Sequence, residues 1–131
     1  MKRVYIILAM LVSSLFADGF FAIEHDYNAA IKEAKKIHKP IFLMFSTKTC
    51  PECNYMKQVV FKDKRVSEYI HKNFLPVMLD IKTDKIPKDL KFIGIPTFFV
   101  ISENGKNLGK LVGAMPADKF LNAFKGNRNA K

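Results

Sequence analysis

The chain is poor in cysteine and has no tryptophan. Its 131 residues include only two cysteines, Cys50 and Cys53, so neither a disulfide framework nor a four-cysteine zinc site can form. No internal repeat or low-complexity linker is present, which excludes repeat arrays. The length suits one domain with a single core.

Acidic residues are also scarce, with 12 against 22 basic residues and a net charge of +10. Such an excess can attract nucleic acid, an anionic membrane face or an acidic partner. The lysines, however, are scattered along the chain and form no basic block interleaved with aromatic residues. We therefore interpret the charge as a solvated, lysine-rich surface and expect no nucleic-acid partner.

The longest apolar run lies at the amino terminus, where Lys2 and Arg3 precede residues 4–12. Small residues follow, and this order is typical of a secretory signal peptide cleaved after Ala17 or Gly19. An uncleaved membrane anchor is the alternative, but the run is shorter than the roughly 20 residues that span a bilayer. No cysteine follows the run for lipid attachment, and the chain has no Arg-Arg pair for twin-arginine export. The mature protein is therefore expected outside the cytoplasm, where disulfides persist.

Apolar periodicity predicts alternating helices and strands after this segment. The first half should begin with a short apolar segment at 20–23, either an edge strand or a staple that packs against the first helix. A helix from N-cap Asp26 to about His38 and a buried strand at 41–45 should follow. A helix from Pro51 with Met56, Val59 and Val60 inward, a second helix to about 71–73 and a strand at 74–81 complete this half. The second half should contain a short helix at 86–92 with Ile86, Leu90 and Ile93 inward, a strand at 97–101, an Asn104-Gly105 hairpin, a strand through Leu108 and Val112 and a helix from Pro116. This order predicts an α/β fold with a central mixed β-sheet and helices on both faces.

The stretch Cys50-Pro51-Glu52-Cys53 lies between a buried strand and a helix. Two residues between the thiols let one sulfur at the helix start lie beside the other one turn further in, so a disulfide can open and close. At the positive end of the helix Cys50 is the expected nucleophile, and Cys53 the resolving thiol. Half of a zinc site is the alternative, which the lack of a second ligand pair disfavours.

Together with Gly94-Ile95-Pro96-Thr97 before a later strand and the final Asn-Gly hairpin, this motif resembles the thioredoxin superfamily. More narrowly, residues 26–81 resemble secreted bacterial thioredoxin-like proteins, including the periplasmic C-terminal domain of the transmembrane disulfide-interchange reductase. The matching pieces are Lys39-Pro40, Phe61-Lys62-Asp63 with Val66, and Asn73-Phe74. The signal pattern marks residues 1–19, and the resemblance implies a thioredoxin-like domain at 20–125 followed by a basic polar tail at 126–131. It also implies a periplasmic, monomeric oxidoreductase without a cofactor or metal.

The resemblance further implies a cis Pro96, with the Ile95 backbone opposite a redox-active Cys50–Cys53 disulfide and able to pair with a substrate segment. Pro51 and Glu52 are expected to tune the redox pair. The Glu52 carboxylate raises the free energy of a Cys50 thiolate, which favours a reductant or isomerase over an oxidant.

Two residues depart from cytoplasmic thioredoxin. Thr49 replaces the tryptophan that usually precedes the first cysteine. Met44 occupies the strand position of a buried aspartate that helps to move the proton of the resolving cysteine. The proton route from Cys53 is therefore open.

Two other functions stay open at this point. A copper or zinc carrier would use the same cysteine pair, although the histidines at 25, 38 and 71 are separated and are expected at the surface. A non-catalytic thioredoxin-like adaptor would not need Cys50. For the oxidoreductase, the expected partners are exported proteins with thiols or disulfides, apocytochrome c among them, and a membrane disulfide reductase as electron donor.

Overall fold

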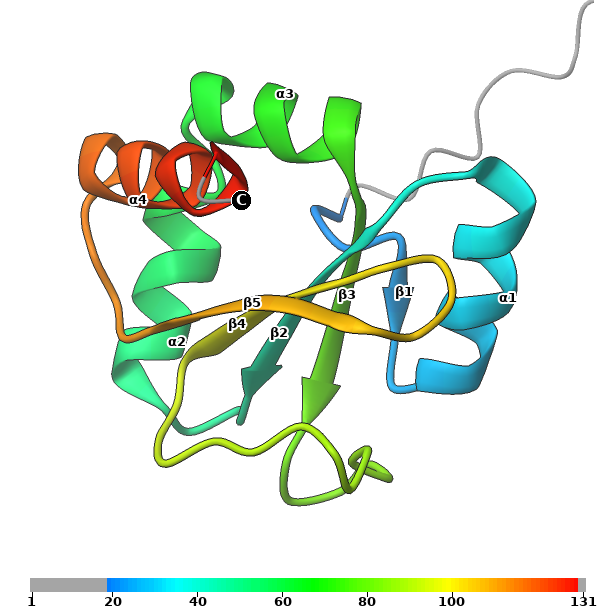
Figure 1. Cartoon of the computed structure of the whole chain (residues 1–131). Coiled ribbons are helices and arrows are strands. Elements are labelled where there is room, and N and C mark those ends of the chain that lie inside the picture. The colour runs from blue at the N-terminus through cyan, green and yellow to red at the C-terminus, as the bar shows by residue number, and fades with distance from the viewer. Residues whose placement is uncertain (1–18, 130–131) are drawn as a thin grey trace, which may run out of the picture.

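The computed structural model describes residues 19–129 and their side chains as far as 126, as a mixed sheet between helices (Figure 1). The elements in chain order are β1 (Ile23–Glu24), α1 (Tyr27–Ile37), β2 (Ile41–Ser46), α2 (Pro51–Tyr55), the π-helical segment η1 (Met56–Val60), α3 (Lys64–Asn73), β3 (Leu75–Asp80), β4 (Thr97–Ile101), β5 (Asn107–Val112) and α4 (Ala117–Asn129). Residues 1–18 of the expected signal segment lie outside the described part. The expected tail overlaps α4, whose backbone continues to Asn129.

The five-stranded sheet has the order β1-β3-β2-β4-β5. β3 runs parallel to both β1 and β2, whereas β4 is antiparallel to β2 and β5. Every residue of the central strand β2 is buried, as its unbroken apolar run predicted. The α/β prediction with a mixed sheet is confirmed.

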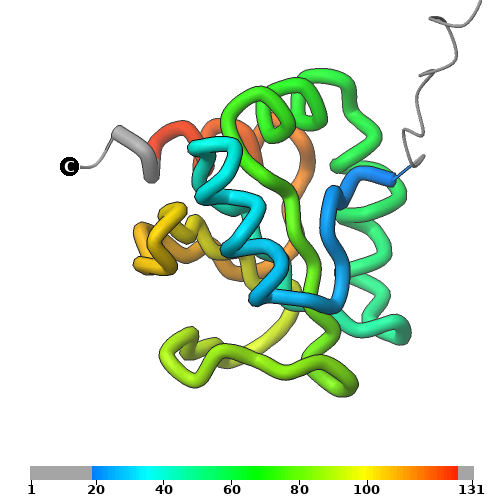
Figure 2. Tube along the Cα trace, turned by 90° about the vertical axis from the view of Figure 1, so that its right-hand side faces the viewer, coloured from blue at the N-terminus to red at the C-terminus, as the bar shows by residue number. Residues whose placement is uncertain are grey.

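Each face of the sheet has its own core. On one face, α2, η1, α3 and α4 pack over a cluster built largely of phenylalanines and methionines, which includes Cys53. On the other face, α1 and the segment at 81–96 cover an aliphatic cluster (Figure 2). The redox motif therefore belongs to the aromatic side of the sheet.

Local sequence signals explain where several elements begin and end. Asp26 is the N-cap of α1 and accepts a hydrogen bond from the Ala29 N–H at 2.9 Å. His38 ends that helix in a left-handed conformation two residues before Pro40. Gly105 turns the β4–β5 hairpin with φ +86°, a conformation that glycine adopts without a steric penalty.

Two expectations about local structure were wrong. The segment 86–92 forms no helix and instead turns at Pro87, whose carbonyl accepts from the Leu90 N–H at 3.2 Å. Phe92 takes the inward position, with its ring 5.0 Å from that of Phe45, and Ile93 is left 95% exposed. An isolated helix of seven residues is of marginal stability, so this segment is stabilised more by packing Ile86, Leu90 and Phe92 against the sheet than by helical hydrogen bonds.

The second error concerns Val59, which is 55% exposed although helical spacing placed it inward. The Phe61 N–H donates to the Met56 carbonyl at 2.8 Å, so the chain makes a π-helical turn here. The wider turn keeps Met56 and Val60 buried and rotates Val59 into solvent.

Candidate active site

The disulfide pair lies at the carboxyl edge of the sheet, where β2 leads into α2. Cys50 is the N-cap of α2 and Pro51 occupies its first turn, where a missing N–H costs no helical hydrogen bond. The structure joins the Sγ atoms of Cys50 and Cys53 as a disulfide, with 5.2 Å between the Cα atoms. Both predicted cysteines are therefore brought together as expected.

The two sulfurs differ in exposure and in their hydrogen-bond partners. Cys53 is fully buried, whereas Cys50 is half-buried at the surface of the aromatic cluster. The Cys53 N–H donates to Cys50 Sγ at 3.1 Å, and the Asn54 N–H donates to the Cys50 carbonyl at 3.0 Å. A donor aimed at Sγ and the positive end of the helix both favour a thiolate on Cys50. Cys50 can therefore attack a partner protein, whereas the buried Cys53 cannot contact that partner directly.

The segment before β4 lies at the same edge of the sheet. The Ile95–Pro96 peptide bond is cis, as the resemblance implied. Thr97, the first residue of β4, pairs with Phe45 near the end of β2, so Ile95 and Pro96 lie beside the loop that carries Cys50. The Thr97 hydroxyl donates to the Gly94 carbonyl at 2.6 Å and fixes this bend.

The residues expected to tune the pair are at the surface. Glu52 is exposed in the first turn of α2 and no hydrogen bond fixes its carboxylate within the described residues. Lys48 is exposed in the loop before the motif, and its carbonyl accepts from the Asn54 side chain at 3.4 Å. Solvent therefore weakens, without abolishing, the effect of both charges on the sulfurs.

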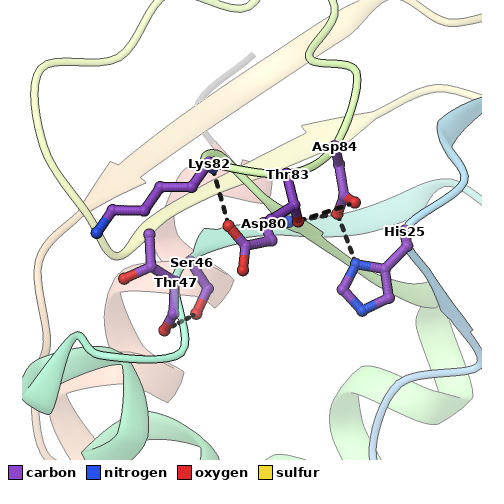
Figure 3. A network of polar contacts seen from close by, with 7 residues as sticks. All are labelled: His25, Ser46, Thr47, Asp80, Lys82, Thr83 and Asp84. Carbon is purple, nitrogen blue, oxygen red and sulfur yellow. Dashed lines mark hydrogen bonds and ion pairs between the residues drawn. The ribbon is translucent and has the colours of Figure 1, made fainter.

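A polar network that the sequence did not reveal extends along the same edge (Figure 3). Asp80, the last residue of β3, is 5% exposed, and its carboxylate accepts from the Lys82 N–H at 2.8 Å. Asp84 accepts from the Asp80 N–H at 2.6 Å and contacts His25 Nδ1 at 2.6 Å. One signal in the sequence could have indicated this network: a single aspartate, Asp80, ends a buried strand that runs parallel to β2. The carboxyl ends of parallel strands meet at one edge of the sheet, so this carboxylate had to lie near the loop of Cys50.

The remaining histidines lie at the surface as expected. His38 is exposed and lies 3.4 Å from Glu103, and His71 contacts the carbonyls of Ser67 and Phe20, each at 2.7 Å. Within residues 19–129, no three side chains of histidine, cysteine, aspartate or glutamate gather in a geometry that could hold a metal ion.

The fold and the cysteine pair define a thioredoxin-like protein. The profile of the Thioredoxin-like domain family matches residues 27–126, and the chain belongs to that family. A proposed disulphide isomerase from Bacteroides thetaiotaomicron superposes with a TM-score of 0.75 at 28% identity, over 88% of this chain and 98% of that one. The reduced C-terminal domain of DsbD from Neisseria meningitidis superposes with a TM-score of 0.65 at 26% identity, over 79% and 98%.

A curated relative agrees with this placement. The thiol:disulfide interchange protein DsbD of Campylobacter jejuni is 27% identical over 109 residues, which is 76% of this chain and 19% of that longer protein. Fold, relatives and cysteine pair together identify a thiol–disulfide oxidoreductase that exchanges disulfides with thiol or disulfide substrates. In the part of the chain that the structure covers, no helix is long and apolar enough to cross a membrane.

Proposed function

We propose that this chain works in the periplasm as a reductant or isomerase for exported proteins and is regenerated by a membrane disulfide reductase. One observation carries the direction of transfer: the exposed carboxylate of Glu52 stands between the two cysteines in the first turn of α2. A negative charge there raises the free energy of the Cys50 thiolate and so destabilises the reduced, dithiol form of the pair. A less stable reduced form gives up its electrons more readily, which makes the pair a better electron donor. The apolar run at 4–12 supports export.

The exchange follows from the unequal exposure of the two sulfurs. The Cys50 thiolate attacks a disulfide of the partner, and one partner sulfur leaves as a thiol after taking up a proton. A mixed disulfide then joins Cys50 to the partner. Cys53 attacks Cys50 Sγ, the second partner thiol leaves, and two electrons have passed from the cysteine pair to the partner. The partner segment is proposed to pair with the backbone at Ile95 while the mixed disulfide exists.

Trapping tests the exchange with partners. Cys53→Ala leaves Cys50 without a resolving thiol, so in a periplasmic fraction it should accumulate mixed disulfides that a reducing agent dissolves. The double variant Cys50→Ala with Cys53→Ala is the matched control and should trap nothing. Equal capture by both variants would contradict a role for Cys50.

A redox titration against glutathione tests the direction. We expect a reduction potential below about −200 mV, on the reducing side of disulfide isomerases at about −180 mV. A potential near the roughly −120 mV of strong periplasmic oxidants would overturn the reductant proposal.

A further inference from the structure

Cys53 has to lose its proton before it can resolve a mixed disulfide, yet its side chain is fully buried. Met44, which holds the position of the buried aspartate of related proteins, is itself fully buried and apolar. The described part of β2 therefore supplies no carboxylate on this face, and the proton must reach solvent by another route.

A cavity of about 190 Å³ lies between η1 and the carboxyl ends of β2 and β3, and the loop that leads to Cys50 forms part of its wall. Its lining includes Ser46, Thr47 and Asp80 from the strand ends, together with Glu24 from β1. Ser46 and Asp80 are direct neighbours in the parallel register, which puts the Asp80 carboxylate at the edge where the Cys50 loop begins (Figure 3). A cavity of this size, with charged side chains and a serine in its wall, has room for several water molecules, each of which needs about 30 Å³.

Lys57 reaches the same cavity from η1, which directly continues the helix α2 that carries Cys53. The two residues are four positions apart, so their side chains leave neighbouring points on one helix face. Burial lowers the pKa of Lys57, and the facing carboxylates of Glu24 and Asp80 oppose that effect. A partly desolvated cation, four residues after Cys53 in the chain, therefore faces two carboxylates across the cavity.

Other charged groups surround Lys57, and each bears on any pH dependence. Lys48 and His25 line the same cavity. A neighbouring cavity on the other side of Lys57 is lined by further charged and titratable residues: Lys62, Lys64, Glu68 and His71. Those side chains are exposed, so salt and solvent screen them more strongly than Glu24 and Asp80 across the cavity.

We propose that Asp80 takes up the Cys53 proton through water in this cavity, while the Lys57 ammonium stabilises the Cys53 thiolate. The inference rests on the proposed function. The proton passes from Cys53 Sγ to the Asp80 carboxylate, and the thiolate attacks Cys50 Sγ. The bond between Cys50 and the partner breaks, and the partner sulfur leaves as a thiolate that takes a proton from solvent. Lys57 is a positioning residue, because it acts on Cys53 and not on the partner.

The reaction of the reduced mature protein with dithiobis-nitrobenzoate separates the two steps. Attack by Cys50 releases a first thionitrobenzoate, and attack by Cys53 on the mixed disulfide releases a second. Stopped-flow absorbance from about pH 5 to pH 9 gives the pH midpoint of each phase. A wild type that releases no second thionitrobenzoate would refute the proposed function itself, because the pair would not cycle.

In a wild type that cycles, Lys57→Met should move the midpoint of the second phase upward by about half to one pH unit, slowing it roughly threefold to tenfold at neutral pH. Lys57→Arg keeps the charge and should restore the second phase to within about twofold. Asp80→Asn keeps the acceptor for the Lys82 N–H but not the base, and should slow the second phase by a similar factor.

Lys62→Met is the matched control, since it removes an exposed charge that does not line the cavity beside the strand ends. It should leave the second phase within about twofold of the wild type. The proposal is overturned if Lys57→Met behaves like Lys62→Met, or if both phases shift equally. A loss of rate in Asp80→Asn without a change in the pH profile would also overturn it, as a packing defect would give that result.

Discussion

At the scale of single residues, the carboxylate of Glu52 lies between the two cysteines in sequence and in the first turn of α2. Glu52→Gln removes its charge without a large change in shape. The reduced form gains stability because the Cys50 thiolate loses a repulsive neighbour, so the reduction potential should rise by about 10–30 mV. Glutathione titration at low and high salt measures it, with Glu52→Asp as the control that keeps the charge. An unchanged potential would show that solvent screens Glu52 completely.

Asp84 is a second residue whose charge matters, because it ties β1 to the turn after β3. Burial works to raise the pKa of Asp84, but the hydrogen bonds from the Asp80 N–H and from His25 outweigh it and hold that pKa below its usual value. A carboxyl with a lowered folded-state pKa stabilises the fold above its unfolded pKa of about 3.9, and this stabilisation is lost as the pH falls through the lower folded value.

Asp84→Asn should therefore cost about 1 kcal/mol of unfolding free energy at neutral pH, since solvent screening limits the ionic part. The gap between the variant and the wild type should close as the pH falls below about 4. Urea unfolding at several pH values measures both quantities. A gap that stays constant down to acid pH would show that the charge of Asp84 contributes nothing.

At the scale of elements, the segment before β1 is fastened to the helices on the aromatic face. The Phe20 ring stacks on Phe61 at 4.3 Å between centroids, and the Phe20 carbonyl lies 2.7 Å from His71 Nε2. The Ala22 N–H donates to the Pro76 carbonyl at 2.9 Å, which continues the β1–β3 pairing toward the amino terminus. Residues directly after the expected cleavage site are therefore part of the folded domain.

Phe20→Ala should lower the unfolding free energy of the mature protein by about 1–2 kcal/mol, because a half-buried ring and its aromatic partner are lost. Phe20→Leu is the matched control and should recover most of this loss by restoring apolar area. Denaturant unfolding of the three proteins gives the comparison. If Phe20→Ala is as stable as the wild type, the segment does not contribute to the domain.

At the scale of the whole molecule, the location of the protein decides which partners it meets. We predict that residues 1–19 direct export of an attached alkaline phosphatase that lacks its own signal, giving enzyme activity outside the cytoplasm. Leu8→Arg interrupts the apolar run and should abolish that activity, since a charge in the run opposes insertion. The mature amino terminus should be Asp18 or Phe20 by terminal sequencing. A full-length, membrane-bound product would instead support the uncleaved anchor.

The sequence by itself determined the features that depend on near neighbours or on an unbroken pattern. β2 was predictable because its apolar run is continuous, and α1 because Asp26 and Pro40 bound it. The cysteine pair could be placed because two thiols three positions apart at the start of a helix come close enough to form a disulfide. The cis Pro96 could be predicted because the cysteine pair and Ile95-Pro96 occur together in a known superfamily.

Only the tertiary structure decided what depends on residues far apart in the chain. Phe92 replaced Ile93 in the core because the ring of Phe45 was there to receive it, and helical spacing alone cannot show this. Glu24, Lys57 and Asp80 come from three separate elements and meet in one cavity only because β1, β3 and η1 pack together. Free energies of packing and desolvation are set by such long-range contacts, so they become readable only once the chain is folded.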